Sequence, residues 1–191
     1  MWSERGHTVF EMAVVMLLLG VMLAMSPPLF EARRREAYIL GAGRVFKGEF
    51  LKARSVAVRQ NAYVAIRFER GADGRTSTST YLDGDDDGVR AADIRSGVDR
   101  RISGPVHLTT PERVEVAIQP NTPELPPERG LLDTTDPIRF AHDTVSFSPV
   151  GTATPGTFYL AGSGVQGAVR VTPGSARVRL MIYRGRVWEE R

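Results

Sequence analysis

The chain has 191 residues, and its 25 lysines and arginines are nearly balanced by 22 aspartates and glutamates, for a formal net charge of +3. That balance gives no general nucleic-acid signal, and the length suffices for one membrane anchor and one modest globular domain. Cysteine is absent, which excludes a disulfide framework, a thiol nucleophile and any cysteine-based metal site.

The first predicted element is an almost unbroken apolar run, residues 12–30, which begins directly after Glu11. About 19 residues that each rise by about 1.5 Å form a helix of about 28 Å, enough to cross the hydrocarbon core of a bilayer. A carboxylate in such a span costs about 2.5–3.5 kcal/mol at full depth, so it usually has a positively charged partner. We therefore predict a transmembrane helix over residues 7–30.

The segment in front of that run, Gly6-His7-Thr8-Val9-Phe10-Glu11, resembles the processing signal of type IV pilins and pseudopilins. In that signal a glycine, four residues and a glutamate precede an apolar helix. The resemblance implies that residues 1–6 are a leader, that prepilin peptidase cuts between Gly6 and His7, and that the new amine of His7 is methylated. It also implies that Glu11 pairs with the N-terminal amine of a neighbouring subunit during assembly. His7 departs from the phenylalanine that is usual at this position.

Two other interpretations of the apolar run remain open. A cleaved secretory signal also has a basic start and an apolar stretch, but its one small-residue site, Ala24-Met25-Ser26, is followed directly by two prolines. An ordinary single-span anchor would have the same length. Three arginines, residues 33–35, follow the run, so the positive-inside rule alone would favour the opposite orientation. The resemblance, which places the N-terminus in the cytoplasm, takes precedence here.

Residues 31–60 keep a helical pattern, because apolar side chains recur at steps of three and four residues. Gly41, Gly43 and Gly48 weaken this helix by about 1 kcal/mol each relative to alanine, so packing on a sheet must hold it. We predict an amphipathic half that continues the membrane helix and lays its apolar stripe on the globular domain.

After Gln60 the period changes to two, as Val64, Ile66 and Phe68 alternate with other residues. A turn at residues 71–74 and a second strand at residues 76–82 predict a hairpin. Further strands are predicted at residues 114–119, 138–141, 145–148, 157–161, 168–171, 176–183 and 186–188, and the proline-rich residues 121–137 predict a long surface loop. The pattern favours an α+β fold: a long N-terminal helix packed on an antiparallel β-sheet or small β-sandwich, with residues 61–191 as the globular domain.

Residues 53–58 leading into 64–66, the acidic turn of residues 81–88, and residues 145–151 are similar, in this order, to the globular domain of the GspH/FimT family of minor pseudopilins. The likeness implies a pilin-like fold, anchored in the bacterial inner membrane by a single span, with the globular domain in the periplasm. It implies a structural role in the pseudopilus of type II secretion, with other pseudopilins and prepilin peptidase as partners. A minor pilin of a type IV pilus is the alternative, since both systems use the same signal and domain. A plain anchored periplasmic binding domain comes last.

Asp83, Asp85, Asp87 and Gly88 match the opening of a calcium loop, in which alternating carboxylates wrap the ion. The twelfth position should be a bidentate acid, yet it is Ile94. We therefore expect a solvated acidic turn and no cofactor, with a weak calcium site of extracellular grade as the alternative.

Catalytic patterns are weak. His142, Asp143 and Ser146 are close in sequence, but their spacing gives no fixed triad geometry. The sequence has neither a phosphate-binding glycine loop nor a set of zinc ligands, so we do not expect an enzyme.

The last long strand suggests one further partner, DNA. Val178, Leu180 and Ile182 alternate with Arg177 and Arg179, and Arg186 follows nearby. DNA-binding FimT-like pilins carry a C-terminal Gly-Arg-x-Arg, whereas alanine precedes Arg177 in this chain. A DNA-uptake receptor that uses Arg177, Arg179 and Arg186 is thus an alternative. A solvated strand face is favoured, because two aligned arginines supply few of the phosphate contacts that binding needs.

Overall fold

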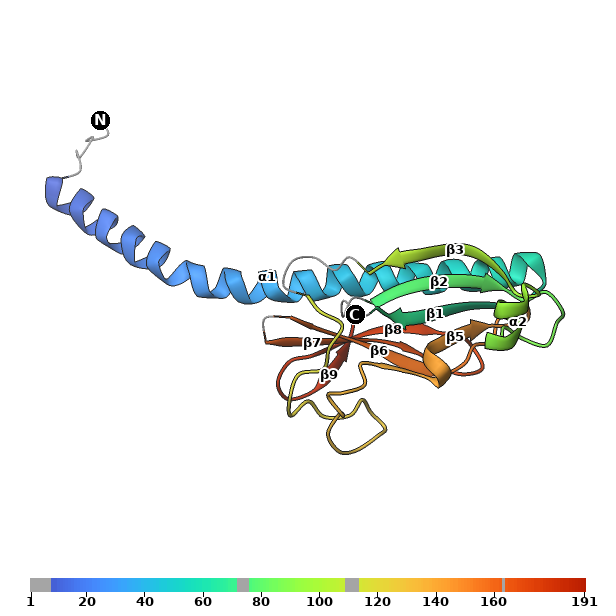
Figure 1. The fold of residues 1–191 in the computed structure, drawn as a ribbon. Helices are drawn as coiled ribbons and strands as arrows, with labels where there is room; N and C mark the ends of the chain where they lie inside the picture. The colour runs from blue at the N-terminus through green and yellow to red at the C-terminus, as the bar shows by residue number, and fades with distance from the viewer. Residues whose placement is uncertain (1–7, 72–75, 109–113, 163) are drawn as a thin grey trace.

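The structure is a computed structural model, and it describes residues 8–71, 76–108, 114–162 and 164–191, with the backbone alone for residues 23–30 and 32. The predicted leader, residues 1–6, and the predicted methylation site, His7, lie outside the described residues. One helix and two antiparallel sheets make up most of the fold (Figure 1), which confirms the predicted α+β class.

Helix α1 (Val9–Gln60) starts and ends on residues that complete its backbone hydrogen bonding. Thr8 is the N-cap, and the side chain of Thr8 accepts a hydrogen bond from the backbone of Glu11. Asn61 ends the helix in the left-handed conformation, with φ 50° and ψ 41°, and its N–H bonds to the carbonyl of Ala57. A left-handed asparagine is a common helix stop, because its short polar side chain tolerates positive φ.

The strands form a four-stranded sheet of order β3-β2-β1-β5 and a five-stranded sheet of order β4-β6-β7-β8-β9. The strands are β1 (Val64–Arg70), β2 (Thr76–Leu82), β3 (Arg100–His107), β4 (Ile138–Phe140), β5 (Thr144–Phe147), β6 (Gly156–Gly162), β7 (Val165–Val171), β8 (Val178–Tyr183) and β9 (Trp188–Glu190). Short helices α2 (Ala91–Ser96) and η1 (Ala141–Asp143) lie between strands. All the strand pairs are antiparallel, and β1 and β2 form the predicted hairpin, with Val64 opposite Leu82 and Arg70 opposite Thr76.

The main core lies where the C-terminal half of α1 packs against both sheets. Phe50 of α1 is 1% exposed, and its ring centroid lies 6.2 Å from that of Phe68, 5.9 Å from Phe140 and 6.4 Å from Phe147. These rings come from strands β1, β4 and β5, so one helical side chain joins the two sheets. Aromatic pairs at such separations add to the stabilisation that burial provides.

At two glycines, one in the helix and one in the five-stranded sheet, the helix and the sheet approach closely. A Cβ on Gly43 would lie 2.4 Å from Cδ1 of Leu180, and a Cβ on Gly167 would lie 2.5 Å from Cγ2 of Ile39. A Cβ at Gly41 would meet no atom within 4 Å. Close packing against Leu180 therefore explains the glycine at position 43, but no such contact explains Gly41.

A second apolar cluster lies apart from the main core, and residues 118–132 contribute to it. The buried side chains of Leu125 and Leu132 pack there with Tyr159 and Trp188. The indole N–H of Trp188 donates to the carbonyl of Pro123 at 3.0 Å. The proline-rich segment predicted as a surface loop thus carries part of a second apolar cluster.

One predicted strand is wrong, and two elements of the structure were not predicted. The strand predicted at residues 114–119 is wrong, because within the described part of this segment the pairing is an isolated bridge between Glu115 and Ala161. Strand β3 and helix α2 were not predicted. Strand β3 is largely exposed and contains Gly104-Pro105, so it lacks the apolar alternation that marks a half-buried strand.

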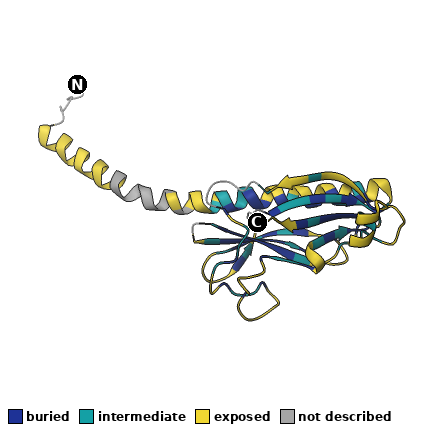
Figure 2. Ribbon diagram, in the orientation of Figure 1, coloured by how far each residue is buried: buried dark blue, intermediate teal, exposed yellow. Residues whose placement is uncertain are grey.

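The N-terminal half of α1 projects away from the sheets, and its described side chains are exposed (Figure 2). Val9 is 88% exposed and Phe10 is 77% exposed. In the part of the chain that the structure describes, no helix has both the length and the apolarity needed to cross a membrane. Of the predicted span, His7 and the side chains of residues 23–30 lie outside the described part.

Candidate functional site

Glu11 lies in the first turn of α1, where its carboxylate helps to cap the helix that carries it. The backbone N–H of Thr8 donates to Oε2 of Glu11 at 2.8 Å, and the N–H of Glu11 donates to Oγ1 of Thr8 at 3.3 Å. This reciprocal arrangement is a capping box, and a negative charge is favourable at the positive end of the helix dipole. A carboxylate has about four acceptor positions, so the hydrogen bond of the capping box uses only part of them.

Thr8 is a functional candidate that the sequence interpretation missed. The spacing Thr8-x-x-Glu11 in front of an apolar run is the usual sequence mark of a capping box, so the signal was available. The capping box gives Glu11 a structural role besides the predicted assembly role. Gly6 and His7, the predicted processing residues, lie outside the described residues.

The acidic turn after β2 brings Asp83, Asp85 and Asp87 together, with one ligand oxygen from each within 4.8 Å of the others. Asp83 is buried, and its two oxygens accept hydrogen bonds from the N–H of Asp85 at 3.2 Å and of Gly88 at 2.9 Å. Asp85 and Asp87 are exposed, and Asp87 pairs with Arg90. Desolvation and the neighbouring Asp87 carboxylate raise the pKa of Asp85. These three carboxylates are close enough together to ligate one hard cation.

A further buried acid, Asp99, holds this turn from the other side. Asp99 is 2% exposed, and its oxygens accept from the N–H of Gly84 at 3.3 Å and of Arg90 at 2.8 Å. Gly84 is required there, since a Cβ would lie 2.2 Å from the carbonyl oxygen of Val98. Backbone N–H groups thus satisfy both buried carboxylates without an ion, which favours a structural role for the turn.

The structure brings Arg177 and Arg179 together on one carboxylate. Nη2 of Arg177 lies 2.8 Å from Oε1 of Glu190, and Nη2 of Arg179 lies 2.7 Å from Oε2 of the same residue. The hydrogen bond from Arg179 lowers the pKa of Glu190. Arg186 lies apart from this pair, in the turn that joins β8 to β9, at the opposite end of β8 from Arg177. The predicted DNA-binding set is therefore divided, and two of its members share a partner on the adjacent strand.

Two hollows were also missed by the sequence interpretation. An apolar groove of about 580 Å³ lies between α1 and strands β1–β3, lined by residues that include Phe46, Phe68 and Val106. A polar cleft of about 610 Å³ contains Tyr159, whose pKa is raised to about 12 by burial. In the same cleft, Arg170 makes two hydrogen bonds to the carboxylate of Glu128, at 3.0 and 2.6 Å. Residues from distant elements line both hollows, so no local motif marks them.

Comparison with known proteins identifies a family. The family model described as type II transport protein GspH matches residues 42–176, which is more than half of the chain. No curated protein and no solved structure matches the chain. The matched region holds the C-terminal part of α1 and the acidic turn, whereas Glu11, Arg177, Arg179 and Arg186 lie outside it.

Proposed function

The chain belongs to the type II transport protein GspH family, a family of structural pseudopilins, and on that premise we propose that it is a minor pseudopilin of a type II secretion pseudopilus. The family match over residues 42–176 carries this proposal. The globular domain would be displayed in the periplasm, and other pseudopilins of the same filament would be its partners. The role would be structural, with no reaction and no cofactor of its own.

The exposed apolar half of α1 supports the proposal that a membrane or other subunits cover this part of the helix when the protein functions. Large apolar side chains are exposed from Val9 to Met22, whereas the first buried side chain of the helix is that of Ile39, which is 0% exposed. Soluble monomers rarely expose contiguous apolar surface on this scale. We propose that residues 7–30 span the inner membrane before assembly and lie among neighbouring helices in the filament.

Assembly would use the charge of Glu11. A leader cut between Gly6 and His7 would create an N-terminal amine, methylated on His7, that must enter an apolar helical bundle. Glu11 of a neighbouring subunit would neutralise this amine, because charge pairing is strong at low dielectric and an unpaired buried charge is costly. The capping contact with Thr8 supports this role by holding the carboxylate at the start of the helix.

A minor pilin of a type IV pilus remains the alternative, since it would use the same signal and domain. The proposal does not extend to a DNA-uptake receptor. Arg177 and Arg179 both pair with Glu190, so phosphate would have to compete with an internal carboxylate.

The proposal is tested by producing the full chain together with a prepilin peptidase and the other pseudopilins. Mass spectrometry should show loss of Met1–Gly6 and a methyl group on the amine of His7, and the product should crosslink to other pseudopilins in the inner membrane. Processing should stop in Gly6→Val, the matched control. An intact leader in the unmodified chain, or a cut after Ser26, would rule out the pseudopilin assignment.

A further inference from the structure

Three consecutive arginines, Arg33, Arg34 and Arg35, follow the apolar half of α1, and all three are exposed. Successive helical residues are turned by about 100° and rise by about 1.5 Å, so these side chains cover about 200° of the circumference within about 3 Å of helix length. They form an arginine ring at one depth rather than a stripe along one face. Ile39, at 0% exposure, is the first buried residue after the ring, and the three arginines before it are exposed, so the globular domain leaves the ring uncovered.

The nearby acids neutralise only part of this ring. Arg35 pairs with Glu31 at 3.1 Å, but both side chains are largely exposed, so water and salt weaken the pair. Glu36 is held instead by Arg184 of the globular domain, at 2.5 Å. Among the described residues, Glu31 is the carboxylate that pairs with the ring, so three arginines and one glutamate give this part of the helix a net positive charge.

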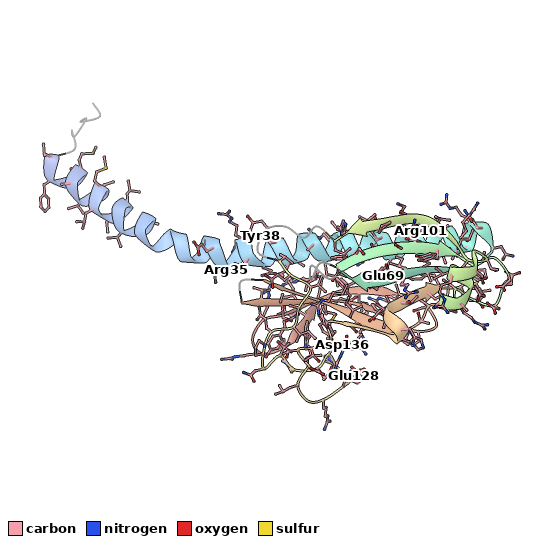
Figure 3. The ribbon with its side chains drawn as sticks, in the orientation of Figure 1. Arg35, Tyr38, Glu69, Arg101, Glu128 and Asp136 are labelled. Carbon is pink, nitrogen blue, oxygen red and sulfur yellow. The ribbon has the colours of Figure 1, made fainter. Side chains whose placement is uncertain are left out.

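An aromatic side chain lies beside the ring. Nη2 of Arg34 donates to the hydroxyl of Tyr38 at 3.1 Å, and the guanidinium carbon lies 5.8 Å from the ring centroid of Tyr38. Figure 3 shows Arg35 and Tyr38 on the stretch of α1 between the projecting half and the globular domain. Tyrosine is enriched where a helix leaves a bilayer on either side, because its ring is apolar and its hydroxyl is polar.

We propose that the arginine ring binds the anionic phosphate headgroups of phospholipids at the membrane surface from which the globular domain emerges. This inference rests on the proposed function, since it requires the apolar half to be inserted. Arg34 follows the last residue of the apolar run by four positions, about 6 Å of helix, which places the ring at headgroup depth. A planar layer of headgroups can contact all three arginines at once although they point in different directions, whereas a single protein surface would contact one side. Guanidinium groups bind phosphate oxygens through paired hydrogen bonds.

The test uses the full chain reconstituted in phosphatidylcholine vesicles that contain spin-labelled phosphatidylglycerol or spin-labelled phosphatidylcholine. Electron paramagnetic resonance then gives the ratio of the association constants of the two labelled lipids for the protein. We expect a preference for phosphatidylglycerol of about fivefold to tenfold, which Arg33→Gln/Arg34→Gln/Arg35→Gln should abolish. The matched control, Arg44→Gln/Lys52→Gln/Arg59→Gln, removes three exposed charges of the same helix beside the globular domain and should keep the preference.

Resistance to alkaline extraction from the same vesicles reports insertion separately. If the chain inserts but binds the two lipids equally, or if the triple ring variant keeps its preference, the headgroup inference is wrong and the proposed function stands. If the chain does not insert at all, both are wrong. A ring variant that loses crosslinking to other pseudopilins while its lipid preference is unchanged would assign the ring to a protein contact and overturn the inference.

Discussion

Glu11 combines two roles that substitutions can separate. Its carboxylate accepts the N–H of Thr8 at 2.8 Å, and its charge is the group proposed to meet a neighbour's N-terminal amine. Glu11→Gln removes the charge but keeps a carbonyl oxygen that can accept the same N–H. Thr8→Ala removes Oγ1, the acceptor of the N–H of Glu11 at 3.3 Å, and keeps the charge. Glu11→Gln therefore tests the charge that assembly is proposed to need, and Thr8→Ala tests the capping of the helix.

The expected magnitudes differ enough to distinguish the two roles. Loss of an N-cap side chain costs about 0.5–2 kcal/mol of helix stability. Burying an N-terminal amine without its partner costs about 3–5 kcal/mol, a reduction of about a hundred-fold to several-thousand-fold in association. Glu11→Gln should therefore be processed and inserted normally, because removing a charge makes insertion easier, and should fail to enter the filament. Thr8→Ala should still assemble.

The assay is co-purification of crosslinked pseudopilins from cells that lack the unmodified chain, with mass spectrometry to verify processing of each variant. Secretion, or piliation in the alternative system, is measured in the same strains. Normal assembly of Glu11→Gln would show that Glu11 is not the assembly contact. Failure of Thr8→Ala together with normal assembly of Glu11→Gln would show that capping, and not charge, is what assembly requires.

Three further predictions follow from the globular domain. Gly43→Ala should lower the free energy of unfolding because the new Cβ would lie 2.4 Å from Leu180, whereas Gly41→Ala, with open space around it, should raise that free energy by about 1 kcal/mol. Denaturant unfolding measures both changes, and equal effects of the two variants would contradict the packing at Gly43. Calorimetric titration of the full chain in detergent should show no calcium binding tighter than about millimolar, and micromolar binding that Asp85→Ala abolishes would contradict it. Gel shifts at near-physiological salt should show at most weak, salt-sensitive DNA binding, and low-micromolar binding lost in Arg177→Ala/Arg179→Ala would revive the uptake receptor.

Local periodicity was enough to predict much of the fold. The helical pattern of residues 31–60 ends at Gln60, where α1 ends, and the alternation around Val64 and Ile66 marks β1. Residues 76–82 match β2 without a shift. These elements were predictable because each buries one face, and burial of one face imposes a period on the sequence. The capping box of Thr8 and Glu11 is equally local and could have been predicted from its spacing.

Tertiary packing decided what periodicity cannot express. Strand β3 lacks a buried face and so has no apolar alternation. The reason for a glycine at position 43 is visible only in the structure, where Leu180 leaves no room for a Cβ. Arg177 and Arg179 form ion pairs with Glu190, which makes them less available to phosphate, and these pairs exist only because β9 pairs with β8. Asp99 reaches the acidic turn in a similar way, from beyond α2. Such contacts join residues far apart along the chain, and a pattern read over a few neighbouring residues contains no information about them.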